Sequence, residues 1–165
     1  MMTQRVRVGD VFLIPIDGPR FGVGQVAGDW KGELYLVIYD AVTTGNVDLP
    51  DALRSKPLFA ALSLDAKIHN GDWKIIGNVM DNLGDVPQPV FKVHEGTKVF
   101  IETRDRSATR PATEEEADLL RLRTVVAPIR LEKALKAHHG LGEWNPKYEE
   151  LRADYAAASS RVITA

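Results

Sequence analysis

Three apolar runs near the start of the chain decide its fold: VGDVFLIPI at residues 8–16, RFGVGQV at 20–26 and LYLVIYD at 34–40. Each run has the length and the β-branched and aromatic composition of a strand. The connections are short and rich in glycine, with turn signals at residues 17–19 and 28–32. Strands joined by short turns usually pair with their neighbours in the chain. The stretch therefore predicts an antiparallel meander that forms a strongly bent sheet or a small β-barrel.

Strand-like segments continue up to residue 104. We expect strands at 59–64, 73–79 and 98–102, where apolar and β-branched residues are concentrated. Residues 43–57 are rich in polar residues, glycine and proline, which predicts a long loop with one helical turn. The polar segment 104–111 predicts a flexible connection to the rest of the chain.

Helix signals fill the last third of the chain. Thr113 and Glu116 have the spacing of a capping box, so a first helix is expected from residue 114 to about 123. Pro128 and Gly140 bracket a second helix, and a third is expected after Pro146. The sequence predicts the α+β class: a strongly bent antiparallel sheet or small β-barrel followed by C-terminal helices. It predicts a single domain over 1–165, mainly β at 5–104 and helical at 113–159.

Composition narrows the classes of function. The chain of 165 residues is 44% hydrophobic, has no cysteine and carries a formal net charge of −2. Disulfides, thiolate metal sites and thiol catalysis are therefore excluded. Lys and Arg are balanced by Asp and Glu in every part of the chain, which speaks against a nucleic-acid partner. We find no signal peptide and no apolar run long enough to span a bilayer, so we expect a cytoplasmic protein without a membrane partner.

Several motifs with a possible chemical role are better explained by structure. Gly22-x-Gly24 leads into another strand, whereas a dinucleotide loop must open a helix, so we expect no cofactor there. His138 and His139 are adjacent on the second predicted helix and point about 100° apart, so we expect no metal site.

An acid–base pair remains an alternative. His69 and His94 lie in predicted loops near Asp72 and Glu95, and a fold could bring a histidine and a carboxylate together for catalysis. Acidic residues are also spread over loops and strand ends, as at Asp29, Glu33, Asp40, Asp48 and Asp51. Nothing in the local sequence positions any of them, so we predict no catalytic residue and no enzyme.

The apolar blocks resemble a known family. Residues 9–16, 21–26 and 36–40 are similar to the three N-terminal blocks of the immunity protein 26 family of bacterial toxin–antitoxin systems. Residues 73–77 resemble a later block, and the likeness extends over about 6–104. The resemblance implies a small cytosolic protein that binds a cognate toxin and blocks it without catalysis. It identifies no toxin-contacting residues.

The predicted loops supply candidate contact residues. Trp30 lies in a glycine-bounded hairpin loop, and tryptophan is enriched among interface residues that contribute most to binding. It can also pack on the protein itself. Candidate contacts with a toxin are Asp29, Trp30, Lys31, Asp48 and Asp51. The alternatives are a small β-barrel that binds nucleic acid or acts as an adaptor, and an enzyme with a loop His–carboxylate pair. The sequence carries no signal for an oligomeric state.

Overall fold

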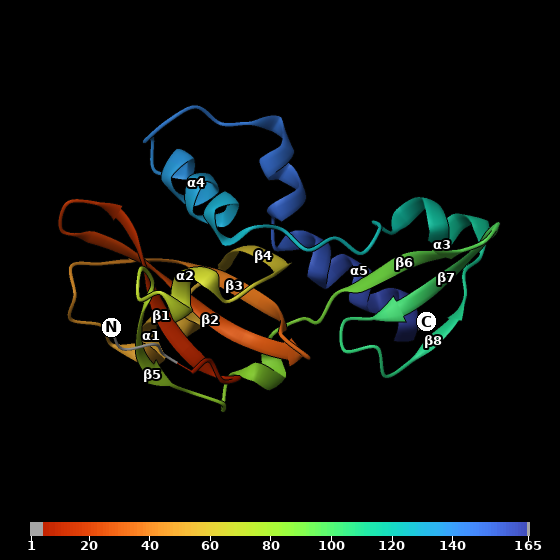
Figure 1. The fold of residues 1–165 in the computed structure, drawn as a ribbon, viewed down its shortest axis with the longest axis horizontal. Coiled ribbons are helices and arrows are strands. Elements are labelled where there is room, and N and C mark those ends of the chain that lie inside the picture. The colour runs from red at the N-terminus through yellow and green to blue at the C-terminus, as the bar shows by residue number, and fades with distance from the viewer. Residues whose placement is uncertain (1–4, 165) are drawn as a thin grey trace.

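The structure, a computed structural model, describes residues 5–164 (Figure 1). It contains a five-stranded sheet in the order β4-β3-β2-β1-β5 and a three-stranded sheet in the order β6-β7-β8. The strands are β1 (Asp10–Asp17), β2 (Arg20–Trp30), β3 (Glu33–Thr43), β4 (Pro57–Ser63), β5 (Lys74–Asn78), β6 (Val90–Glu95), β7 (Lys98–Thr103) and β8 (Thr109–Pro111). Every strand pairing is antiparallel. The predicted α+β class is confirmed.

The larger sheet is open, so the small β-barrel, one of the two forms predicted, is not the form that the described residues adopt. A barrel would need β4 to pair with β5, but these strands are the two edges of the sheet. The outer edge of β4 is occupied instead by later parts of the chain, through isolated bridges from Phe59 to Arg152 and from Leu62 to Val125. The sheet is thus covered at this edge without closing on itself.

The predicted meander is present as β1, β2 and β3, and its turns explain its path. Lys31 and Gly32 join β2 to β3 with φ angles of 50° and 90°, the left-handed conformation of a two-residue hairpin turn. The hairpin loop is therefore shorter than the predicted 28–32. Gly24 is required for packing, because a Cβ there would lie 2.5 Å from the Phe12 ring.

Both faces of the larger sheet are buried, which explains why its strands are almost continuously apolar. Phe12 belongs to one core cluster, and its neighbour Val11 belongs to the other. The first face packs against α4 (Pro128–His138) and against Trp73, whose ring stacks on Phe12 at 5.2 Å. The second face packs against α5 (Asp154–Thr164). Helices on both sides therefore fix the sheet in a three-layer arrangement.

The three-stranded sheet lies at one end of the molecule (Figure 1). The sequence does not predict β6, and it predicts a flexible connection where β8 pairs with β7. The prediction of one sheet over 5–104 was therefore incomplete. Prolines at 87 and 89 and the polar residues of β6 obscure its strand pattern. Residues 5–8, at the start of the region predicted to be mainly β, are not part of either sheet.

The C-terminal region is helical as predicted, with different boundaries. The capping box of Thr113 and Glu116 is present, but α3 (Glu114–Leu119) ends four residues early. The third predicted helix divides into a 3₁₀ helix, Pro146–Leu151, and α5, because Arg152 between them bridges to β4. The remaining helices of the described residues are α1 (Leu49–Arg54), which is the helical turn expected in the long loop, α2 (Ala66–His69), and a short 3₁₀ helix, Leu83–Asp85.

An extended segment, residues 120–127, connects α3 to α4, and we call it the strap. It pairs in parallel with β6 at Lys92 and then with β4 at Leu62. The Val126 amide donates to the Leu62 carbonyl at 2.9 Å, and the Val126 carbonyl accepts from the Ser63 hydroxyl at 2.7 Å. The strap therefore joins the two sheets along one side.

Candidate partner-binding site

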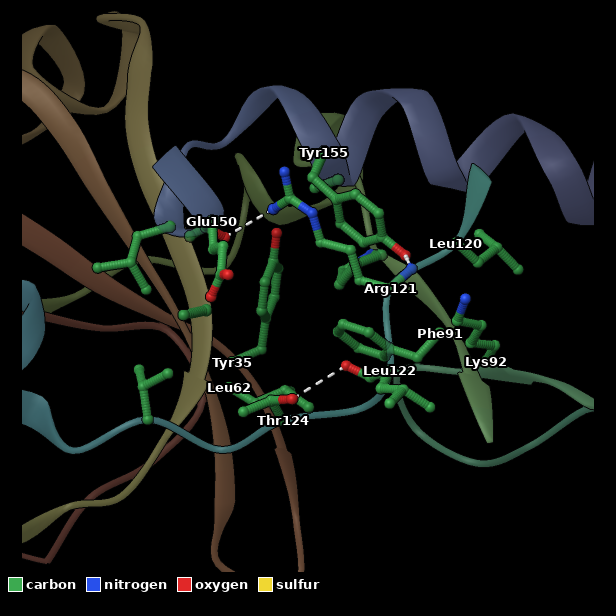
Figure 2. A pocket seen from close by; sticks show the side chains of 16 residues that line it. Tyr35, Leu62, Phe91, Lys92, Leu120, Arg121, Leu122, Thr124, Glu150 and Tyr155 are labelled. Carbon is green, nitrogen blue, oxygen red and sulfur yellow. Dashed lines mark hydrogen bonds between the residues drawn. The ribbon is translucent and has the colours of Figure 1, made fainter. Parts of the chain in front are cut away.

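A cavity of about 400 Å³ opens where the strap, both sheets and the C-terminal helices meet. Figure 2 shows Tyr35, Phe91 and Tyr155 around the same space. The walls come from β3, β4, β6, the strap, the 3₁₀ helix and α5. The lining residues are Tyr35, Ala60, Ala61, Leu62, Pro89, Phe91, Lys92, Leu120, Arg121, Leu122, Thr124, Val126, Glu150, Leu151, Tyr155 and Ala156. Most of these side chains are apolar or aromatic, as in many ligand-binding hollows.

The uneven cover of β4 creates the cavity. The Ala153 amide donates to the Leu58 carbonyl at 3.0 Å near one end of the strand, and the strap bonds to Leu62 near the other. Ala60 and Ala61 lie between these two points and line the cavity. Their small side chains leave the space that larger residues would fill.

The tyrosines in the cavity are held as neutral hydroxyl groups. Tyr35 is 1% exposed and donates to the Pro87 carbonyl at 3.2 Å, and burial raises its pKa above the usual range. Tyr155 donates to the Val90 carbonyl at 2.7 Å and accepts from the Arg121 amide at 2.9 Å. Burial also raises the pKa of Tyr155. Both hydroxyl groups are therefore bonded within the protein, and the rings offer apolar contact to the cavity.

Two cations lie on the cavity wall without acidic partners. Lys92 donates to the Ala117 carbonyl at 2.7 Å. Arg121 donates to the Glu150 carbonyl at 2.7 Å, and its guanidinium lies 4.6 Å from the centre of the Tyr155 ring. The Glu150 carboxylate instead faces Arg130 at 3.8 Å. Within residues 5–164, neither Lys92 nor Arg121 forms an ion pair, so this wall has excess positive charge.

The structure separates the five predicted contact residues into two groups. Asp29, Trp30 and Lys31 lie at the β2–β3 turn, whereas Asp48 and Asp51 lie beyond the other end of β3. A strand of 11 residues spans roughly 35 Å at ~3.3 Å per residue. The two groups therefore do not share one compact surface.

Each group also has local bonds. The Asp29 carboxylate accepts from the Gly32 amide at 2.8 Å and so supports the turn. Arg106 lies 4.0 Å from the centre of the Trp30 ring, so the tryptophan packs partly on the protein itself. Asp48 caps α1 by accepting from the Asp51 amide at 3.1 Å.

An ion cluster that the sequence does not predict lies between the turn and the cavity. Arg123 of the strap contacts Glu33 of β3 at 2.6 Å and Glu102 of β7 at 2.7 Å, and its side chain is 7% exposed. Arg106 faces the same two carboxylates at 3.6 and 3.8 Å. The bond from Arg123 to Glu33 spans 90 residues of sequence, so no local pattern reveals it.

The histidines considered for catalysis lie on different elements. His69 ends α2 and lines a small hollow with Asp29 and Asp65, while His94 pairs with Val99 in the other sheet. In the described part of the chain, neither imidazole is hydrogen-bonded or ion-paired to a carboxylate. No group of three or more potential metal ligands is found among residues 5–164.

The fold and the cavity define a small α+β protein with an apolar hollow between two sheets. The family model of Immunity protein 26 matches residues 7–99, more than half of the chain, which therefore belongs to this family of immunity proteins. The match ends within β7, so the strap and α3 to α5 lie outside it. No curated protein and no solved structure matches the chain. Across the described residues, no helix is long and apolar enough to cross a membrane.

Proposed function

We propose that this protein binds a cognate bacterial toxin in the cytoplasm and neutralises it by covering the toxin's active site or substrate surface. Family membership over residues 7–99 is the observation that carries the proposal. The separation of His69 on α2 from His94 on β6 supports a role in binding rather than acid–base catalysis by these two residues.

We further propose that the β2–β3 turn is a principal contact. Tryptophan and arginine are enriched among the residues that dominate binding energy, and Trp30 and Arg106 stack together there. Asp29 and Lys31 lie beside them as polar contacts. A standard interface covers about 800 Å² on each partner, a patch roughly 30 Å across. One such patch centred on Trp30 extends only about 15 Å from it and does not reach Asp48 and Asp51, which lie beyond the far end of β3, so these two remain predicted as contacts outside the main patch.

Co-expression tests the proposal. The wild-type chain should restore growth of bacteria that express the toxin domain encoded beside its gene, and the purified proteins should form a complex. Replacing Trp30 with alanine should weaken binding about tenfold or more. Asp51→Lys should weaken it less than about threefold, since surface charges contribute little. If neighbouring toxin domains neither bind the protein nor are neutralised by it, the proposal is wrong.

The mode of inhibition needs a separate measurement. Occlusion predicts that the purified protein competes with the toxin's substrate, so that the inhibitor concentration needed rises with substrate concentration. A complex in which the toxin remains fully active would contradict occlusion. The control is Lys98→Glu, an exposed charge reversal on β7, which should inhibit like the wild type.

A further inference from the structure

Exposed apolar side chains are concentrated beside the cavity. Leu119, Leu122 and Val125 are 71%, 48% and 40% exposed, and all lie on or next to the strap. Leu122 also lines the cavity, so the apolar surface runs from the strap into the hollow. Exposed apolar side chains beside a hollow are typical of a site that contacts another molecule.

The charges of the wall indicate the chemistry of that molecule. Among residues 5–164, the side chains of Lys92 and Arg121 contact only backbone carbonyls and an aromatic ring. The one carboxylate of the lining, Glu150, is balanced by Arg130. An acidic partner would gain attraction from both cations, and it would meet no uncompensated carboxylate in the lining. Cations that already hold backbone bonds are also fixed in place before a partner arrives.

We propose that this cavity receives one large apolar side chain carried on an acidic segment of the toxin. This inference rests on the proposed function and names the anchor of the interface. A volume of about 400 Å³ lies at the lower end of the range for ligand pockets, which suits a single aromatic side chain and its backbone better than a large cofactor. Tyr35, Phe91 and Tyr155 supply aromatic contact, and Arg121 and Lys92 meet the flanking carboxylates.

Synthetic peptides test this chemistry directly. The probes are three peptides of equal length: tryptophan flanked by glutamates, tryptophan flanked by lysines, and alanine flanked by glutamates. In NMR titrations of the full chain, only the first should shift the amide signals of Ala60, Leu122 and Ala156 strongly, and the shifts should weaken with added salt. Equal shifts from all three peptides, or shifts confined to other surfaces, would overturn the inference.

Matched variants extend the test to the toxin. Ala60→Phe fills the cavity from β4, and Arg121→Glu reverses one of the two cations. Each should weaken toxin binding about tenfold or more, whereas Lys98→Glu, a charge reversal outside the cavity, should not. Thermal melting must show that each variant is folded. As a second way to fill the mouth without touching the sheet, Thr124→Trp on the exposed strap should have the same effect.

The outcomes distinguish the role of the cavity from the proposed function of toxin binding. If the toxin binds the wild type and all the variants equally, the cavity is not its anchor, although the protein remains a toxin binder. If no toxin binds but the acidic tryptophan peptide still shifts the cavity signals, the pocket chemistry stands and the proposed function fails.

Discussion

Arg123 should contribute more to stability than any other ionic group near the cavity. Its side chain is 7% exposed, and it binds two carboxylates, Glu33 and Glu102, whose side chains are 14% and 13% exposed. It also donates to the carbonyls of Thr103 and Arg104. Removal of one member of a buried ion pair costs about 3–5 kcal/mol, because the remaining charge stays buried. Arg123→Ala is therefore expected to lower the free energy of unfolding by that amount.

Arg106 provides a matched control, since it faces the same two carboxylates. It is 36% exposed and lies 3.6 and 3.8 Å from them, so its ion pairs are worth at most about 1 kcal/mol. Its stacking on Trp30 adds about 0.5–1 kcal/mol. Arg106→Ala should thus cost clearly less than Arg123→Ala, although each change removes one arginine.

Urea denaturation and thermal melting measure both variants. A loss of 1 kcal/mol lowers the melting temperature by about 2–4 °C for a chain of this size, so Arg123→Ala should lower it by about 6–20 °C. The urea midpoint should fall while the slope stays unchanged. If the two variants lose the same stability, or if Arg123→Ala loses less than about 1 kcal/mol, the reasoning from burial is refuted. Combining Arg123→Met with glutamine at positions 33 and 102 should recover most of the loss.

Three further predictions concern packing, a buried indole and acid stability. Gly24→Ala should lower the urea midpoint, because the added Cβ would lie 2.5 Å from the Phe12 ring. Gly84→Ala is the control, since a Cβ there has nothing within 4 Å and should leave the midpoint unchanged. Equal losses of stability in the two variants would contradict this prediction. Trp73→Phe should lower the free energy of unfolding in urea by about 2–4 kcal/mol, because it removes buried volume and a hydrogen bond of 3.0 Å to the buried Glu132 carboxylate. Wild-type stability of this variant would show that the indole does not stabilise the core. Hydrogen bonding to an arginine lowers the pKa of Glu116 to about 2, so its stabilisation is complete above about pH 5 and is lost as the pH falls toward 2. Acid unfolding of Glu116→Gln should therefore depend less on pH in this window, and an unchanged pH profile would count against it.

The parts of the fold that the sequence predicted are those set by neighbouring residues. The apolar runs of β1 to β3 and the capping box of Thr113 each carry their signal within a few positions. The strap was missed because Leu122 and Val125 continue an apolar pattern that also suits a helix. Its extended shape depends on pairing with Lys92 and Leu62, which are remote in sequence.

The candidate site follows the same rule. The β2–β3 turn was identified from glycines around Trp30, because a hairpin tip is a local feature. The cavity is built from six separate parts of the chain, and its size depends on the small side chains of Ala60 and Ala61 at an edge strand. Such a cavity depends on distances between residues that are brought together only by folding, so the sequence alone does not predict it.

The strap also bears on how the protein reaches its native state. Val126 of the strap is bonded to Ser63 of β4, which lies 63 residues earlier in the chain. This contact closes a long loop and should therefore form late in folding. Until then the outer edge of β4 is an unpaired template on which a second nascent chain can assemble. Residues 120–127 are synthesised only after all the strands of both sheets have been synthesised. Pairing of the C-terminal third with β4 would then remove the exposed edge of the larger sheet and with it a site of aggregation.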